Sequence, residues 1–175
     1  AVVRKMLAEI LGDNTKENLK WKFHLSTDDN HYSTPLDAIN KGLTQYFKGY
    51  SPIRFYSIKE FEDFGGLNAL KTHYKNRGQH FNISTEIHDD TIHYLLNQSI
   101  NDNEFEAFNM FVKEFDGFIA ENNYSIGFIM KFGEFYVSNG EVQKAIDYYK
   151  SELSKNPDSE ELQTAVNRLT SNTKG

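Results

Sequence analysis

The sequence predicts a mainly α-helical protein in which helix-turn-helix units follow a short strand-loop-helix segment. From Ser57 onward, apolar residues recur at steps of three and four positions, which is typical of amphipathic helices. The expected helices are joined by short connections, so sequence neighbours should pack antiparallel. The one convincing strand pattern, an alternation of apolar and polar residues, covers residues 19–25.

The composition is that of a globular protein without a basic face. Of the 175 residues, 38% are hydrophobic and 25% are charged, which allows a core at this length. The formal net charge of -6 disfavours a nucleic-acid partner. No apolar stretch approaches the roughly 18 residues that a membrane span needs. The absence of cysteine excludes thiolate catalysis and Cys-ligated metals. We therefore expect a soluble chain, and the sequence does not distinguish the cytoplasm from the periplasm.

The first fifty residues should contain a helix, a strand and a second helix. Apolar positions at helical spacing predict a helix over residues 2–11. The strand over residues 19–25 would leave its backbone groups unpaired, so it needs partners from elsewhere. Thr34-Pro35 then begins a helix over residues 34–47. Turn-forming residues at 49–52 indicate a boundary between domains of residues 1–50 and 51–175.

Residues 51–175 should be helical throughout. Ser57 and Glu60 predict a capping box at the start of a helix that runs to Tyr74, with a kink or split at Gly65-Gly66. A linker is expected over residues 77–85. Further helices are expected over residues 89–98, 102–116, 125–138, 142–155 and 159–169.

Residues 129–157 carry the most specific spacing in the chain. Eight positions match one 34-residue helix-turn-helix repeat: Ile129, Phe132, Gly133, Tyr136, Gly140, Ala145, Tyr149 and Pro157. This segment resembles a tetratricopeptide repeat (TPR). Small residues at Gly133 and Ala145 would let the two helices approach, and Tyr136 and Tyr149 would fill the groove around that contact. Gly140 would form the turn, and Pro157 would end the second helix.

A degenerate copy is expected before this repeat. An offset of 38 residues places Ala107 and Phe111 over Ala145 and Tyr149, with Leu95 in place of the small Gly133. Residues 159–169 would then be the capping helix that ends such a stack. The alternative is an ordinary helical bundle that matches the repeat spacing by chance.

His31 is the only residue that the sequence nominates for catalysis. It lies in a polar loop directly after the predicted strand. The proton affinity of imidazole suits general acid-base chemistry near neutral pH. The local sequence alone favours a solvent-exposed loop histidine.

The wider sequence around His31 carries a resemblance. Lys20-Trp21-Lys22-Phe23, then Asp28-Asp29-Asn30-His31-Tyr32-Ser33-Thr34-Pro35-Leu36, then a helix ending in Tyr46-Phe47, resembles the C-terminal end of esterases of the enterochelin-esterase-like group of α/β-hydrolases. Several bacterial members continue into a helical extension with TPR-like repeats. The resemblance implies that residues 1–50 are the last strand, histidine loop and last helix of a hydrolase domain, and that residues 51–175 are the extension.

The resemblance gives His31 the role of general base toward a serine nucleophile. The Gly-x-Ser-x-Gly elbow that holds this serine is absent from the chain. Serine and acid precede the histidine in these enzymes, so we expect both upstream of Ala1. Asp28 and Asp29 are interpreted as turn formers. The chain alone should therefore be inactive, and its expected partner is the upstream hydrolase domain or a second copy of the chain.

No metal or cofactor is expected. His73 with His80, and His88 with His93, are separated by seven and five residues, whereas metal-binding pairs on one helix prefer a separation of four. An alternative function, from a different class, is a stand-alone TPR-like module that binds a peptide or protein partner or dimerises. Neither the substrate nor the oligomeric state is indicated by the sequence.

Overall fold

The computed structural model describes Met6, Glu9, Ile10 and residues 32–172, and this part of the chain is mainly α-helical. It contains nine helices, α2 to α10, and no strand. Met6, Glu9 and Ile10 are helical, in agreement with the helix predicted over residues 2–11, whereas the predicted strand over residues 19–25 lies outside the described residues. The chain divides into two compact units, Ala1–Lys48 and Gly49–Gly175.

Helix α2 (Thr34–Tyr46) belongs to the first unit and confirms the helix predicted there. Pro35 lies in its first turn, where no backbone N–H is needed. At the other end, the Phe47 N–H donates to Leu43 O at 2.9 Å. None of the side chains of α2 is buried.

Helices α3 (Ile58–Asp63) and α4 (Gly66–Phe81) begin the second unit. Ser57 Oγ accepts from the Glu60 N–H at 3.1 Å, as the predicted capping box requires. The Glu60 carboxylate closes the cap one residue earlier than expected, because Oε2 accepts from the Tyr56 N–H at 2.8 Å. Gly65, with a φ of 106°, separates the two helices, so the predicted helix is split at the glycine pair.

The linker predicted from Arg77 onward is wrong in its start, because α4 continues to Phe81. Asn82, with a φ of 54°, ends the helix, and its N–H donates to Gly78 O. The lack of a side chain at Gly78 lets the segment after α4 pass close to the helix. A Cβ at this position would lie 2.7 Å from Ser84 O. This glycine therefore marks a close approach of two backbone segments within an intact helix.

Helices α5 (Asp89–Asn101), α6 (Phe105–Glu114) and α7 (Asp116–Glu121) follow. The single helix predicted over residues 102–116 is too long, since α6 starts at Phe105 and ends before Phe115. Helix α7 has no counterpart among the predicted helices. Aromatic packing joins α6 to α8, with the Phe108 ring centroid 4.5 Å from that of Phe132.

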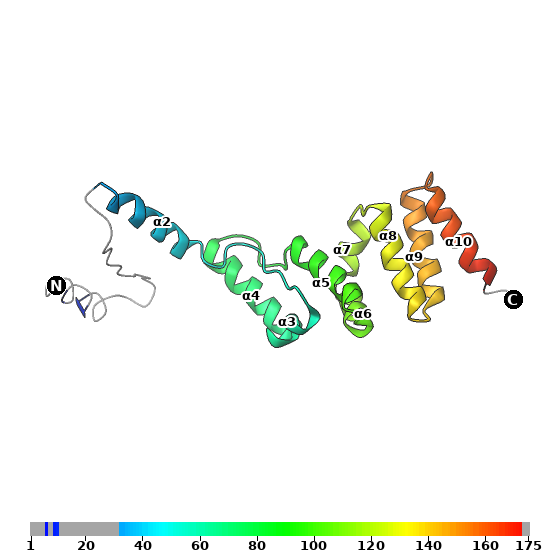
Figure 1. The fold of residues 1–175 in the computed structure, drawn as a ribbon, viewed down its shortest axis with the longest axis horizontal. Coiled ribbons are helices and arrows are strands. Elements are labelled where there is room, and N and C mark those ends of the chain that lie inside the picture. The colour runs from blue at the N-terminus through cyan, green and yellow to red at the C-terminus, as the bar shows by residue number, and fades with distance from the viewer. Residues whose placement is uncertain (1–5, 7–8, 11–31, 173–175) are drawn as a thin grey trace. The chain divides into compact units, whose positions relative to one another are not determined.

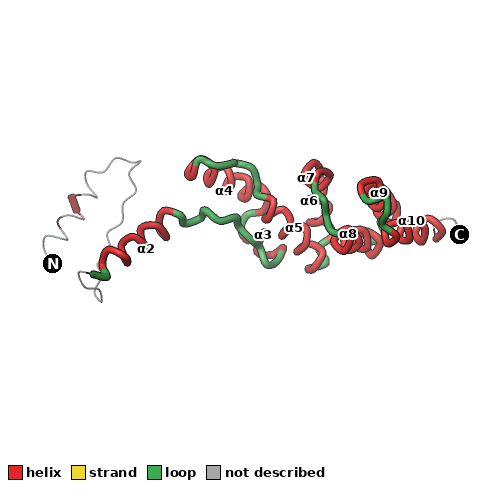
Figure 2. The backbone as a smooth tube through the Cα atoms, turned by 90° about the horizontal axis from the view of Figure 1, so that it is seen from above, coloured by secondary structure: helices red, strands yellow, loops and turns green. Residues whose placement is uncertain are grey.

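Helices α8 (Ile126–Ser138), α9 (Val142–Lys155) and α10 (Glu160–Asn172) form three successive neighbours (Figure 1). Figure 2 shows the same helices, with loops at the turns between them. The core of the second unit runs from α3 to α10 and is rich in aromatic residues. Its fully buried members are Leu70, Tyr74, Leu95, Leu96, Phe108, Phe111, Ile129, Ala145, Tyr149 and Leu162.

Residues 50–57 are held against helices α4 and α5 by hydrogen bonds. Thr91 Oγ1 donates to Ile53 O at 2.6 Å, and the Tyr74 hydroxyl therefore donates to Thr91 Oγ1, also at 2.6 Å. The Arg77 Nε–H donates to Tyr50 O at 2.7 Å. The second unit thus begins with an ordered strap that starts at Tyr50.

Candidate functional site

The predicted catalytic residue, His31, lies outside the described residues, which begin again at Tyr32. Helix α2 starts three residues after His31, at Thr34. The Asp37 N–H donates to Ser33 O at 3.1 Å and fixes the first turn. The structure therefore describes the helix that follows the histidine loop and does not test the role of His31.

One face of α2 is apolar and exposed. Leu36, Ile39 and Leu43 follow the helical repeat and are 73%, 59% and 53% exposed. The polar side of the helix carries an Asp37–Lys41 ion pair at 2.7 Å. A contiguous apolar stripe of this kind marks a surface that packs against another structure, since burying it is favourable by about 25 cal/mol per Å². We call Leu36, Ile39 and Leu43 the α2 stripe.

The predicted contact between α8 and α9 is present. A Cβ at Gly133 would lie 2.2 Å from Tyr149 Cζ, so the tyrosine ring occupies the space that the glycine leaves. The Tyr149 hydroxyl donates to Met130 O at 3.1 Å, and burial raises the Tyr149 pKa to about 12. Ala145 is fully buried in the same interface. Gly140 has the positive φ, 77°, of a turn residue, as expected.

The pair α5 and α6 repeats the turn between α8 and α9 in a register of 37 residues. Asn103 and Gly140 both have positive φ, 59° and 77°. The Glu104 N–H donates to Ser99 O at 2.8 Å, and the Glu141 N–H donates to Tyr136 O at 2.9 Å. The predicted offset of 38 residues is therefore one too many.

The corrected register explains why the earlier pair lacks the close contact. Thirty-seven residues before Gly133 stands Leu96, and the same distance before Ala145 stands Phe108, both fully buried. The predicted offset aligned Leu95 with Gly133, whereas the register of 37 residues aligns Leu95 with Phe132. Large side chains therefore stand at the positions of both small residues. Helices α5 and α6 pack through these large side chains, without a glycine at the contact.

The described histidines have packing or capping roles. The His73 ring lies 5.8 Å from Phe64, and its pKa is lowered by burial and by the Arg77 charge. His88 Nδ1 accepts from the Asp90 N–H at 3.1 Å and caps α5. The rings of His80 and His93 pack on aromatic neighbours. Within the described residues, no group of three or more His, Asp or Glu is placed to hold a metal ion.

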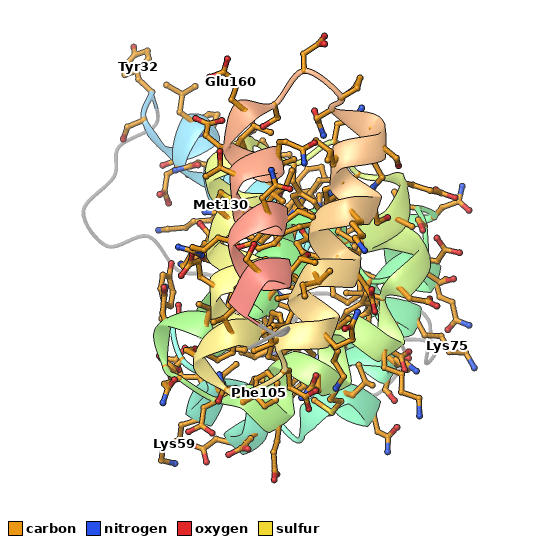
Figure 3. The ribbon with its side chains drawn as sticks, turned by 90° about the vertical axis from the view of Figure 1, so that its right-hand side faces the viewer. Tyr32, Lys59, Lys75, Phe105, Met130 and Glu160 are labelled. Atoms are coloured by element: carbon orange, nitrogen blue, oxygen red, sulfur yellow. The ribbon has the colours of Figure 1, made fainter. Side chains whose placement is uncertain are left out.

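The acidic residues of α3 form a solvated face. Lys59 Nζ bonds Asp63 Oδ2 at 2.6 Å across one helical turn, and this hydrogen bond raises the Lys59 pKa. Figure 3 shows Lys59 pointing outward. In the described part of the chain, no helix is long and apolar enough to span a membrane.

Two polar arrangements were missed by sequence reasoning. Lys131 Nζ donates to Asn97 Oδ1 at 2.6 Å and to Asn101 Oδ1 at 2.7 Å, which links α8 to α5. Glu152, on α9, is only 2% exposed, and its Oε1 accepts from Lys155 Nζ at 2.7 Å. A signal for the second was available, because Ala145, Tyr149 and Glu152 share the four-then-three spacing of one helix face.

A hollow of about 370 Å³ lies between α8 and α10. Figure 3 looks onto this end of the unit, with Met130 and Glu160 labelled. Arg168, on its rim, is held by Glu134 at 2.7 Å. The residues that line the hollow are Met130, Glu160, Glu161, Thr164, Ala165 and Arg168.

Comparisons with known proteins give no family for the chain. No protein-family model, no curated protein and no solved structure matches it.

Proposed function

We propose that the chain is the C-terminal part of a serine-esterase-like α/β-hydrolase with a TPR-like helical extension. The observation that carries this proposal is the α2 stripe, which begins five residues after His31 and buries none of its side chains. In the group of esterases that residues 20–47 resemble, the helix after the histidine loop packs on the sheet. An exposed apolar face at this position is what such a helix would present once separated from its sheet.

The low stability expected of an isolated helix supports a packing partner for α2. An isolated helix of 13 residues is marginally stable in water, so most of its stability has to come from packing of its apolar face. Three exposed branched side chains on one face supply that driving force. The upstream hydrolase domain is the partner that we propose for this face.

In the proposed enzyme, His31 is the general base. Its neutral imidazole would take the proton from a serine hydroxyl as the serine oxygen attacks the ester carbonyl, and the imidazolium would return that proton to the leaving alcohol. Serine, acid and oxyanion donors would come from residues upstream of Ala1. In this proposal, the second unit, residues 49–175, contributes no group to the reaction.

The TPR-like assignment of the extension is supported by the packing of α8, α9 and α10. The Gly133–Tyr149 contact and the buried Ala145 fit the spacing of such a repeat. Helix α10 buries Leu162, Ala165 and Leu169 and keeps a polar outer face, as a capping helix should.

The proposal is tested by the coding sequence upstream of the Ala1 codon. We expect an in-frame extension of about two hundred residues that alternates strands and helices and contains Gly-x-Ser-x-Gly. We also expect residues 1–175 alone to hydrolyse no ester. Ester hydrolysis by this chain that disappears in His31→Ala would contradict the fragment proposal, because it would require a nucleophile within the chain.

A dimerisation module is the second candidate, and the α2 stripe favours it as well. Two copies of α2 could bury their stripes against each other, which would need no upstream domain. Residues 1–175 freed from an upstream domain would expose the same stripe, so the two proposals are separated by sedimentation equilibrium of the polypeptide that the complete reading frame encodes. A dimer that becomes a monomer in the double variant Leu36→Ser, Leu43→Ser would support the module, and a monomer at all concentrations would support the hydrolase partner.

A further inference from the structure

A second hollow, of about 510 Å³, is lined by residues of α4, α5, α6 and α7 and of the loop before α5. Two irregular features of the fold contribute to it. A Cβ at Gly78 would lie 2.8 Å from Thr85 Cα, so the bare glycine lets residues 85–87 lie close to α4 as part of the wall. The short helix α7 supplies another part through its first three residues. We call this space the α4–α7 hollow.

Part of the lining of the α4–α7 hollow is apolar. Ile92 and Phe115, which are 5% and 8% exposed, belong to the core of the second unit. Ile87 and Phe118 pack against that core and remain partly exposed. Apolar side chains that line a hollow and stay in contact with water offer a surface whose burial by a partner is favourable.

The rim of the α4–α7 hollow is acidic. Four carboxylates and one ammonium group line it. The ammonium group of Lys71 forms an ion pair with Glu114, so these two charges balance. The other three carboxylates, of Glu86, Asp89 and Asp116, are exposed and form no ion pair with a lysine or arginine of the described residues. The hollow therefore has an excess of three negative charges.

Helix capping explains only part of this acidity. Asp89 and Asp116 are the first residues of α5 and α7, where the helix dipole favours a carboxylate. Glu114 is the last residue of α6, where the dipole disfavours one. Glu86 lies in the loop before α5, and its N–H donates to Ser84 Oγ at 3.1 Å while its carboxylate accepts no hydrogen bond from the described residues. Two of the four acids thus have no role in starting a helix.

We propose that the α4–α7 hollow docks a short basic and apolar segment of another protein, with a lysine or arginine side chain at its centre. The stem of such a side chain would lie on Ile87 and Phe118, and its charged end would reach the carboxylates of the rim. The Phe118 ring adds a cation–π contact. An apolar neighbour in the segment would cover the rest of the exposed apolar lining.

A protein segment fits this hollow better than a small amine does. The charged residues of the rim are exposed, so the hollow is open to solvent. Small-molecule sites enclose most of the ligand surface, which an open hollow cannot do. The inference concerns the second unit alone and stands whether or not the chain belongs to an esterase.

NMR titration of residues 1–175 tests the proposal. The probe is the peptide acetyl-Gly-Leu-Lys-Leu-Arg-Gly-amide. We expect saturable shifts, with a Kd below about 5 mM, in the amide signals of residues 85–92 and 114–118. Shifts elsewhere only, or none, would overturn the proposal. Equal affinity for the peptide with glutamate in place of lysine and arginine would overturn it as well. Butylammonium chloride that binds as tightly as the peptide would assign the hollow to small amines and overturn the docking of a protein segment.

Two double variants provide a charge-matched comparison. Glu86→Gln with Asp116→Asn removes two rim charges and should weaken peptide binding by about tenfold or more. Glu106→Gln with Asp158→Asn removes two exposed charges outside the hollow and should weaken it by less than about twofold. The amide spectrum of each variant shows whether it is folded. Equal weakening by both variants would show that net charge alone attracts the peptide, and would contradict the site.

Discussion

At the scale of single residues, the closest packing in the second unit is set by Gly133 on α8. The Tyr149 ring fills the space beside it, and that ring is anchored by its bond to Met130 O. The glycine therefore has a steric reason to be there. Its effect can be separated from the ordinary preference of helices for alanine, because a Cβ added at Gly127 in the same helix would meet no neighbouring atom within 4 Å.

We expect Gly133→Ala to destabilise the protein by about 1–3 kcal/mol, because its methyl group overlaps the Tyr149 ring. Gly127→Ala should be neutral or stabilising by up to about 1 kcal/mol, as alanine favours helix. Urea unfolding of both variants checks this pair. Equal stability of the two variants would show that Tyr149 moves aside at no cost.

His73 should make stability depend on pH. Burial and Arg77 lower its pKa in the folded protein below the unfolded value of 6.5, so the unfolded chain binds more protons near and below that pH. The free energy of unfolding should therefore fall as the pH is lowered through about 6.5 and toward the lower pKa of the folded protein. His73→Phe, which keeps an aromatic ring beside Phe64 and Tyr74, should reduce this loss. An unchanged pH dependence in His73→Phe would contradict the assignment.

Residue size decided which side-chain contacts could be predicted from the sequence. Gly133, Ala145 and Tyr149 were identifiable because a small residue on each helix implies close approach. The polar cluster around Glu152 was missed although its spacing marked a buried face. A glutamate is normally assigned to solvent, and only the folded structure, in which Glu152 is 2% exposed, shows otherwise.

At the scale of elements, the strap of residues 50–57 depends on one buried hydroxyl. We expect Thr91→Val to cost about 1–3 kcal/mol, because it leaves Ile53 O and the Tyr74 hydroxyl without their shared partner. Amide exchange in residues 50–57 should rise with it. The control Thr72→Val loses only a bond to Asn68 O in its own exposed helix and should change stability by less than about 0.5 kcal/mol.

Most helices were predictable from apolar periodicity, and the errors have local causes. The sequence suggests a helix end near Gly78, but the role of this glycine is to admit Ser84 and Thr85 against an intact α4. Helix α7 has only six residues, too few for a periodic pattern to show. The repeat offset was one residue too long because side-chain matching, rather than the turn at Asn103, fixed it.

At the scale of the whole molecule, the two units differ in how they are stabilised. The second has a continuous core from Phe55 to Leu169, whereas α2 in the first has no buried side chain. We therefore expect residues 49–175 alone to unfold cooperatively at the same urea concentration as the second unit of the full chain. A lower midpoint would show that residues 1–48 stabilise this core.

The sequence predicted the mainly helical class, but what covers the α2 stripe is not encoded in the helix itself. An amphipathic pattern states that a face will be buried and does not name its partner. The proposed role of His31 likewise depends on a nucleophile and an acid that we expect upstream of Ala1. In our proposal, the covering of the α2 stripe and the partners of His31 have the same source, because the sheet proposed to cover α2 would also hold the nucleophile.

The most direct measurement is therefore ester hydrolysis by the polypeptide that the complete reading frame encodes, with His31→Ala compared with the control His80→Ala. We predict that the wild type and His80→Ala hydrolyse a simple aryl ester and that His31→Ala lowers kcat by about 10⁴-fold or more. Hydrolysis that survives His31→Ala, or a reading frame that begins at Ala1, would contradict the account.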